Sequence, residues 1–255
     1  MLLAIDIGNT HTVFGVFKGA ELRAHWRLAT RTDATEDEIG VLLRSLLADA
    51  AIAGDTVEGV IIASVVPELD AVYAHVGQAY GAGDPLFVGP GIKTGMPIHY
   101  ESPHAVGADR IVNSVAALTR YGAPVIVLDF GTATTFDVVG PGGEYLGGVI
   151  APGLGLSADA LFTRAARLHR VDVRRPARVI GRNTEQSLQA GLFHGYVGLI
   201  EGLVCRIRAE LGHEAPVVAT GGLAPVFAPE LDFLRACDSN LTLDGLRLLW
   251  DKNRK

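Results

Sequence analysis

The sequence has 255 residues, enough for one large domain or for two lobes of about 120 residues each. Hydrophobic residues make up 49% of it, yet no apolar stretch approaches the roughly 20 uncharged residues of a membrane span. This high share of hydrophobic residues therefore predicts buried sheets and a subunit interface. The net charge of −6, the lack of a basic N-terminal region and only two cysteines, without disulfide or metal spacing, predict a cytoplasmic protein that binds neither nucleic acid nor membrane.

The first half of the chain predicts three antiparallel strands followed by alternating helices and strands. Apolar runs at residues 2–5 and 13–17 flank Asp6-Ile7-Gly8-Asn9-Thr10, a pattern typical of strand, tight turn and strand. A capping box at Thr35 and Glu38 predicts a helix over about 36–50. Its apolar stripe should be buried: Ile39, Leu42, Leu43, Leu46 and Leu47. The other expected elements are strands at 21–29, 57–64 and 86–88, helices at 67–80 and 104–121, and an irregular segment over 89–103.

The second half repeats this order, with strands at 124–129, 133–139 and 144–150. A helix begins near residue 157, an irregular excursion covers 167–183, and a long helix covers 184–211. A strand at 216–219, a helix at 223–228 and a closing helix at 241–253 complete the chain. We therefore expect an N-terminal lobe over 1–121 and a C-terminal lobe over 122–255.

One strand-turn-strand unit occurs in both halves. Sliding the chain by 123 residues places Asp6 on Asp129, Gly8 on Gly131 and Thr12 on Thr135. The second copy reads Asp129-Phe130-Gly131-Thr132-Ala133-Thr134-Thr135. Backbone N–H groups and threonine hydroxyls in such a turn suit phosphate oxygens, and a carboxylate beside them calls for a cation such as Mg²⁺. A single Asp-x-Gly is more commonly a turn cap, and the in-register duplication is what favours the phosphate site.

The motifs resemble those of the actin, hexokinase and Hsp70-type ATPase superfamily, and more closely the type III pantothenate kinases. The matching stretches follow the family's order along nearly the whole chain: 6–10, 107–113, 129–135, 147–153, 180–184 and 220–222. This resemblance implies an α/β fold of two tandem ribonuclease H-like (actin-like ATPase) lobes, each a mixed five-stranded sheet flanked by helices. It also implies an enzyme that phosphorylates pantothenate with ATP in the first step of coenzyme A biosynthesis.

The resemblance implies roles for the nucleotide residues. ATP would contact the first hairpin, Thr132 and Gly221. The hairpin residues are Asp6, Ile7, Gly8, Asn9, Thr10, His11, Thr12 and Val13. Asp6 would organise Mg²⁺ through water, and Asp129 would hold a monovalent cation, K⁺ or NH₄⁺.

The resemblance likewise implies the pantothenate site. Asp109 would be the general base that takes the proton from the primary hydroxyl of pantothenate, and its place at a helix N-terminus should favour the ionised form. Arg110 would bind the pantothenate carboxylate. The other implied contacts are Tyr100, Gly107, Ala108 and Thr184, the last reaching in from the partner subunit of a homodimer to which residues 147–160 contribute. Without the resemblance, Asp109 would read as a capping carboxylate and Arg110 as a surface charge.

Two positions depart from the family pattern. His11 replaces an expected small polar residue, where it either tunes nucleotide affinity or is simply exposed. His169 stands where the family tends to have proline, which would loosen an interface segment. Neither departure removes a catalytic group.

Two alternatives stay open. A regulatory protein of the Bvg accessory factor type would share the fold, although the retention of Asp6, Asp109 and Asp129 favours catalysis. A different sugar or acetate kinase of the superfamily is disfavoured by the Gly107-Ala108-Asp109-Arg110 segment and by the small size of the chain.

Overall fold

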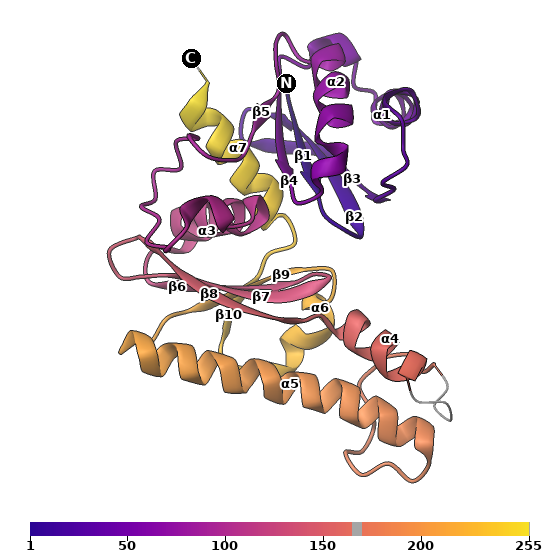
Figure 1. Ribbon diagram of the computed structural model, residues 1–255, viewed down its shortest axis with the longest axis vertical. Coiled ribbons are helices and arrows are strands. Elements are labelled where there is room, and N and C mark those ends of the chain that lie inside the picture. Colours follow the sequence, from indigo (N-terminus) through magenta and orange to yellow (C-terminus); the bar gives the residue numbers. More distant parts are fainter. Residues whose placement is uncertain (165–169, 255) are drawn as a thin grey trace. The chain divides into compact units, whose positions relative to one another are not determined.

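The computed structural model describes residues 1–164 and 170–254, which form two compact units. The first unit comprises residues 1–120 together with 240–255, and the second comprises 121–239. Each unit contains one five-stranded sheet, so the predicted α/β class with two mixed five-stranded sheets is confirmed. The units are described separately below and coloured along the chain in Figure 1.

The first sheet has the strand order β3-β2-β1-β4-β5. Strands β1 to β3 pair antiparallel, while β4 pairs parallel with β1 and β5 pairs parallel with β4. The strands are β1 (Leu2–Ile7), β2 (His11–Lys18), β3 (Glu21–Ala29), β4 (Gly59–Ser64) and β5 (Leu86–Phe87). The helices of this unit are α1 (Glu36–Asp49), α2 (Asp70–Tyr80), α3 (Ala108–Tyr121, whose last residue belongs to the second unit) and α7 (Leu241–Asn253).

Helices cover both faces of the first sheet (Figure 1). Leu3, Ile5 and Phe14 pack with α1 and α2 in one buried core. Because successive side chains of a strand point to opposite faces, Asp6 lies on the other face, where α7 packs. The helix α7 approaches β2 so closely that a Cβ atom on Gly15 would lie 2.9 Å from Leu243.

The second sheet has the order β10-β9-β6-β7-β8. Its antiparallel part, β6-β7-β8, continues into the parallel strands β9 and β10. The strands are β6 (Val125–Phe130), β7 (Ala133–Val139), β8 (Tyr145–Pro152), β9 (Val217–Gly221) and β10 (Leu234–Cys237). The helices are α4 (Leu154–Arg164), α5 (Thr184–Leu211) and the short α6 (Ala224–Phe227).

The long helix α5 lies along one face of the second sheet (Figure 1). Its Phe193, Tyr196 and Ile200 are buried in a core with Leu128 and Phe130 of β6. By length and composition α5 is the one helix of the described residues that could cross a membrane, which the sequence did not predict. The apolar window of α5 is 39% buried, and its buried stripe packs on the second sheet.

Three expectations from the sequence need correction. The closing helix α7 belongs to the first unit, because its leucines pack on β1, β2 and β4. Leu42, expected in the buried stripe of α1, is 48% exposed, because the helix turns it away from the sheet while Leu43 is fully buried. The sequence pattern does not reveal β10, the fifth strand of the second sheet, because four residues at a sheet edge give too short an alternation to recognise.

Candidate functional site

The first hairpin holds Asp6 at the end of β1, opposite Val13 of β2 and beside Ala63 of β4. The backbone N–H of Gly8 donates to the carbonyl of His11 at 3.0 Å and closes a turn with Asn9 at its exposed tip. The predicted strand-turn-strand unit is therefore present, with residues 6–13 in consecutive positions around its turn.

Thr30, which the sequence did not single out, braces this hairpin. Its hydroxyl donates to the carbonyl of Gly8 at 2.6 Å and lies 2.9 Å from the hydroxyl of Thr12. Its backbone N–H donates to the carbonyl of Thr10 at 3.0 Å. Thr30 follows β3, so only the pairing of β3 with β2 reveals this role.

The second hairpin repeats the first with a shorter turn. The backbone N–H of Gly131 donates to the carbonyl of Ala133 at 3.1 Å, and Asp129 pairs with Thr135. In the sequence repeat Thr135 corresponds to Thr12, whereas Asp6 pairs with Val13. The pairing therefore slips by one residue between the two copies.

This slip, together with the pairing of β6 with β9, gives Asp129 a neighbourhood unlike that of Asp6. Thr135 of β7 stands opposite Asp129 on one side, and Thr220 of β9 stands beside it on the other. Asp6 has the apolar Val13 and Ala63 in the same places. Asp129 is thus the carboxylate with hydroxyl-bearing residues in register on both neighbouring strands.

Two glycines bring backbone close to Asp129 and Thr132. Gly221 has a φ of +88°, and a Cβ atom there would lie 2.5 Å from Oδ1 of Asp129. The N–H of Gly153 donates to the carbonyl of Thr132 at 3.1 Å, and a Cβ atom on Gly153 would lie 2.2 Å from that oxygen. Both positions therefore exclude any side chain.

Asp109 lies in the first turn of α3 and is half-buried. Burial raises the pKa of its carboxyl, while the backbone N–H of Arg110, the Arg110 charge and its own backbone N–H oppose that shift. Its Oδ1 accepts the Arg110 N–H at 2.8 Å. The expectation that the helix N-terminus favours the ionised form is therefore outweighed by the loss of solvent. A raised pKa brings a carboxylate closer to the range of an effective general base.

The neighbours of Asp109 show why this segment carries small residues. A Cβ atom on Gly107 would lie 2.6 Å from Oδ1 of Asp109, so Gly107 leaves room for the carboxylate. Arg110 is only 7% exposed, which rules out the alternative that it is a surface charge. Ala108 is the first residue of α3 and is half-buried.

The remaining predicted substrate residues lie on exposed segments. Tyr100 is 37% exposed and lies in the non-helical stretch that precedes α3. Thr184 begins α5 in the second unit, where the side chain of Asn183 accepts the N–H of Gln186 at 2.8 Å. Asn183 thus fixes the start of the helix at Thr184, a capping role that a single Asn before an apolar helix could have signalled.

His11 is exposed at the start of β2. Partial burial and the nearby Arg27 lower the pKa of its imidazole, which keeps it neutral at neutral pH. It therefore adds no fixed charge beside the hairpin. The other departure, at His169, lies outside the described residues, while the neighbouring Arg170 forms an ion pair with Asp159.

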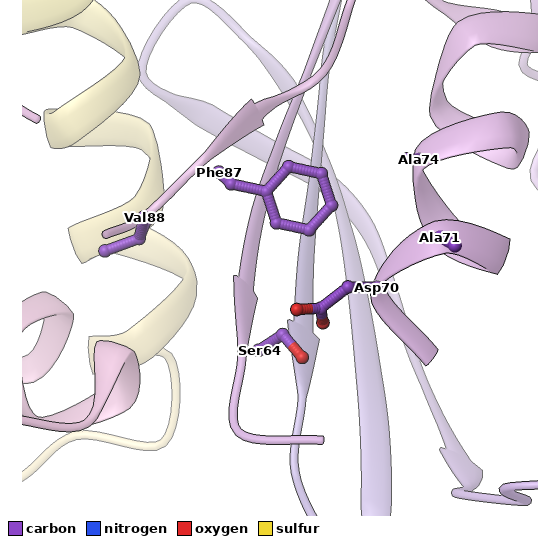
Figure 2. Close-up of a pocket in the computed structure, with 6 residues that line it drawn as sticks. All are labelled: Ser64, Asp70, Ala71, Ala74, Phe87 and Val88. Carbon is purple, nitrogen blue, oxygen red and sulfur yellow. The ribbon is translucent and has the colours of Figure 1, made fainter. Parts of the chain in front are cut away.

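Each unit has a cavity, and the cavity of the first unit adjoins the first hairpin, because its lining residue Ser64 pairs with Ile7 of β1. One of about 430 Å³ in the first unit is lined by Ser64, Asp70, Ala71, Ala74, Phe87 and Val88. Figure 2 shows the side chains of Ser64 and Asp70 pointing toward each other near the ring of Phe87. None of the described residues forms a cluster of three or more metal-binding side chains, so any cation here would rely on water, hydroxyls, backbone or a bound substrate.

Two mixed five-stranded sheets with matching Asp-Gly hairpins define the actin- and hexokinase-like class of ATPases and kinases. Solved structures with this fold include a Campylobacter jejuni protein described as a Baf family transcriptional activator. It has a TM-score of 0.63 and 20% identity, with 98% of each chain covered. Another is a Sinorhizobium meliloti protein described as a 2-dehydro-3-deoxygalactonokinase, with a TM-score of 0.61 and 14% identity over 98% of this chain and 95% of that one.

Sequence comparison identifies the family within this class. The family model described as "Type III pantothenate kinase" matches residues 2–206. A protein of that name from Koribacter versatilis is 52% identical, covering 100% of this chain and 96% of its own. One from Myxococcus xanthus is 53% identical, covering 99% of both. The chain belongs to the type III pantothenate kinase family, so it is an enzyme of the kinase class, as the motifs predicted.

Proposed function

We propose that this chain transfers the γ-phosphoryl group of ATP to the primary hydroxyl of pantothenate, giving 4′-phosphopantothenate and ADP. The observation that carries this proposal is the identity of 51–53% over essentially the whole chain with proteins named type III pantothenate kinase. The phosphorylated product feeds coenzyme A biosynthesis.

Asp109 acts as the general base in this reaction. Phosphoryl transfer depends mostly on positioning and charge neutralisation, with a base that orients the attacking hydroxyl. The raised pKa of Asp109 supports this role, because a poorly solvated carboxylate accepts a proton more readily than an exposed one. The adjacent Arg110 charge opposes this rise of the pKa and so favours the ionised, basic form.

Arg110 binds the carboxylate of pantothenate. A guanidinium presents paired N–H donors in the geometry of a carboxylate, and such a pair gains strength where water is excluded. The burial of Arg110 therefore supports a recognition role. Tyr100, Gly107, Ala108 and Thr184 complete the pantothenate contacts.

The two hairpins hold the nucleotide. Residues 6–13, Thr132 and Gly221 contact ATP, with Asp6 organising Mg²⁺ through water and Asp129 binding a monovalent cation, K⁺ or NH₄⁺. Their donor sets fit these assignments, because Asp129 has threonines in register on both sides and Asp6 offers one carboxylate, which suits a hydrated Mg²⁺. When bound, these cations neutralise phosphate charge.

The enzyme works as a cytoplasmic homodimer that shares Thr184 across its interface. Apolar side chains of the second unit support this proposal, because several large ones near the expected interface segment are exposed. They are Leu146, Ile150, Leu156, Leu161, Val179 and Ile180. Ile180, 82% exposed, precedes Thr184 by four residues, which brings the substrate residue close to the apolar surface.

The test is an ADP-release assay with ATP, Mg²⁺ and pantothenate, with and without K⁺. Turnover that requires pantothenate and rises with K⁺ would establish the reaction and its cation together. Folded protein that binds ATP but shows no pantothenate-dependent turnover would overturn the proposal and favour the regulatory alternative on the same fold.

A further inference from the structure

The segment that carries Tyr100 has little regular structure of its own. It runs from the end of β5 to the first turn before α3, over residues 88–102. Short internal hydrogen bonds shape it: the Ile92 N–H donates to Gly89, and the Thr94 hydroxyl both accepts the Met96 N–H and donates to the Met96 carbonyl. Met96 is 4% exposed and serves as its apolar anchor.

The C-terminal helix α7 is hydrogen-bonded to the backbone of this segment. The Asn253 side-chain oxygen accepts the backbone N–H of Lys93 at 2.9 Å, and its amide nitrogen donates to the backbone carbonyl of Lys93 at 2.9 Å. One carboxamide thus satisfies both backbone groups of a single residue, 160 positions away in the chain. The same amide nitrogen also donates to the carbonyl of Leu249 at 2.8 Å, which fixes the side chain to its own helix.

A second contact lies next to the first. Gly95 has a φ of +72°, and a Cβ atom there would lie 2.8 Å from Nζ of Lys252. The turn at Gly95 and the last turn of α7 therefore meet side by side, and the double hydrogen bond of Asn253 is part of a docked contact.

The helix provides a firm base for this contact. Leu241, Leu246 and Leu249 of α7 are fully buried in the first unit. Trp250 packs so closely on β4 that a Cβ atom on Gly59 would lie 2.1 Å from its ring. A side chain at the end of α7 is therefore held against the same sheet whose first strand carries Asp6.

We infer that Asn253 is a positioning residue for the pantothenate site. It fixes the backbone at Lys93 and thereby limits the range of positions open to Tyr100, seven residues further along. This role rests on the proposed function through the assignment of Tyr100 to pantothenate. A carboxamide is suited to it because a single planar group carries a donor and an acceptor side by side. The family model ends at residue 206, so Asn253 lies outside the segment that it matches.

The variant Asn253→Ala tests this inference in the full-length enzyme. We expect the KM for pantothenate to rise about three- to tenfold, the scale of one or two lost hydrogen bonds, while kcat and the KM for ATP stay within twofold. Amide hydrogen exchange in a peptide spanning 89–101 should become faster. The matched control is Asp251→Ala, which removes ion pairs with Arg247 and Arg254 at the same helix end and leaves the double hydrogen bond intact.

The outcomes separate this inference from the proposed reaction. An unchanged KM for pantothenate in Asn253→Ala would overturn the positioning role, even if the melting temperature fell. Equal rises of KM in Asn253→Ala and Asp251→Ala would also overturn it, because general fraying of α7 would then explain both. If the wild-type protein does not turn over pantothenate, the proposed function fails, and the positioning role of Asn253 for pantothenate fails with it. Hydrogen exchange then still decides whether Asn253 holds the segment.

Discussion

At the scale of single residues, the ionised carboxylate of Asp109 carries an energetic cost that its proposed role as general base would explain. Burial raises its pKa, so the folded protein binds the proton more tightly than the unfolded chain does. The contribution of this group to stability is therefore present at low pH and is lost as pH rises through the folded pKa. At neutral pH the ionised carboxylate works against folding, which is common where a group is kept for chemistry.

We therefore predict that Asp109→Asn separates activity from stability. Turnover should fall about 10²- to 10⁴-fold, because the hydroxyl loses its proton acceptor. The melting temperature at neutral pH should stay equal or rise, because a partly desolvated charge is removed. Steady-state kinetics and thermal unfolding measure the two effects, with the exposed Asp55→Asn as control. A mutant that retains most of its rate would refute the base assignment.

The same raised pKa predicts the acidic side of the pH profile. The base must be ionised to act, so kcat/KM should fall as pH drops through the pKa of Asp109, above the ordinary aspartate value of 3.8. Measuring kcat/KM for pantothenate across pH, under conditions where the protein stays folded, locates this limb. A flat profile down to pH values of about 4 would argue that another group receives the proton.

Gly221 is the second residue whose identity is dictated by its surroundings. In Gly221→Ala the new Cβ atom would lie 2.5 Å from Oδ1 of Asp129 and 2.6 Å from the backbone carbonyl oxygen of Phe130, on a backbone with φ +88°, so it would press on the aspartate and on the strand that carries it. We expect the concentration of K⁺ that gives half-maximal turnover to rise roughly tenfold or more, the scale seen when support around a metal ligand is disturbed. Kinetics across a K⁺ titration measure this shift.

Gly212→Ala is the matched control for that experiment. Gly212 also has a positive φ, +67°, but a Cβ atom there would meet no described atom within 4 Å. It should cost about 1 kcal/mol of stability and leave the K⁺ response unchanged. If both variants shift the K⁺ response equally, backbone strain is responsible and the link to Asp129 is lost.

At the scale of elements, the sequence predicted what local patterns encode. Glycine, apolar alternation and the Thr35–Glu38 capping box placed both hairpins and the start of α1 within a residue or two. The slip of pairing between the hairpins was not predictable, because a turn one residue shorter leaves the aligned glycines in place. The sequence also does not reveal the hydrogen bonds of Thr30 to the first hairpin or the double hydrogen bond of Asn253 to Lys93. Both depend on contacts between segments that are distant in sequence.

The helix α7 illustrates how close packing determines a residue choice. A Cβ atom on Gly245 would lie 2.3 Å from the backbone carbonyl of Val112 in α3. We predict that Gly245→Ala destabilises the protein by about 1–3 kcal/mol, because backbone cannot yield as a flexible side chain can. Denaturant unfolding measures it. Gly198→Ala on α5, with open space around it, should instead be neutral or stabilise by up to about 1 kcal/mol.

At the scale of the whole chain, the duplication in the sequence predicted two lobes. It could not show that the chain returns to the first unit to form α7. The apolar face of α7 alone does not indicate which sheet it covers, and its packing on β1, β2 and β4 places it in the first unit. The hydrophobic residues, 49% of the sequence, likewise lie in two kinds of place. Most of them lie in the two cores, and some of them lie exposed on the second unit around Ile150 and Ile180.

That exposed remainder leads to a prediction about assembly. A charge at Ile180, 82% exposed, should disrupt a dimer without disturbing either core. We expect Ile180→Asp to shift the mass in solution from dimer to monomer, measured by light scattering. Turnover should fall as well, because the proposed contact of Thr184 with the partner's substrate would be lost. Leu42→Asp, on the exposed side of α1, should leave both unchanged. A monomer with full activity would show that Thr184 serves no shared site, and a monomeric wild type would refute the dimer itself.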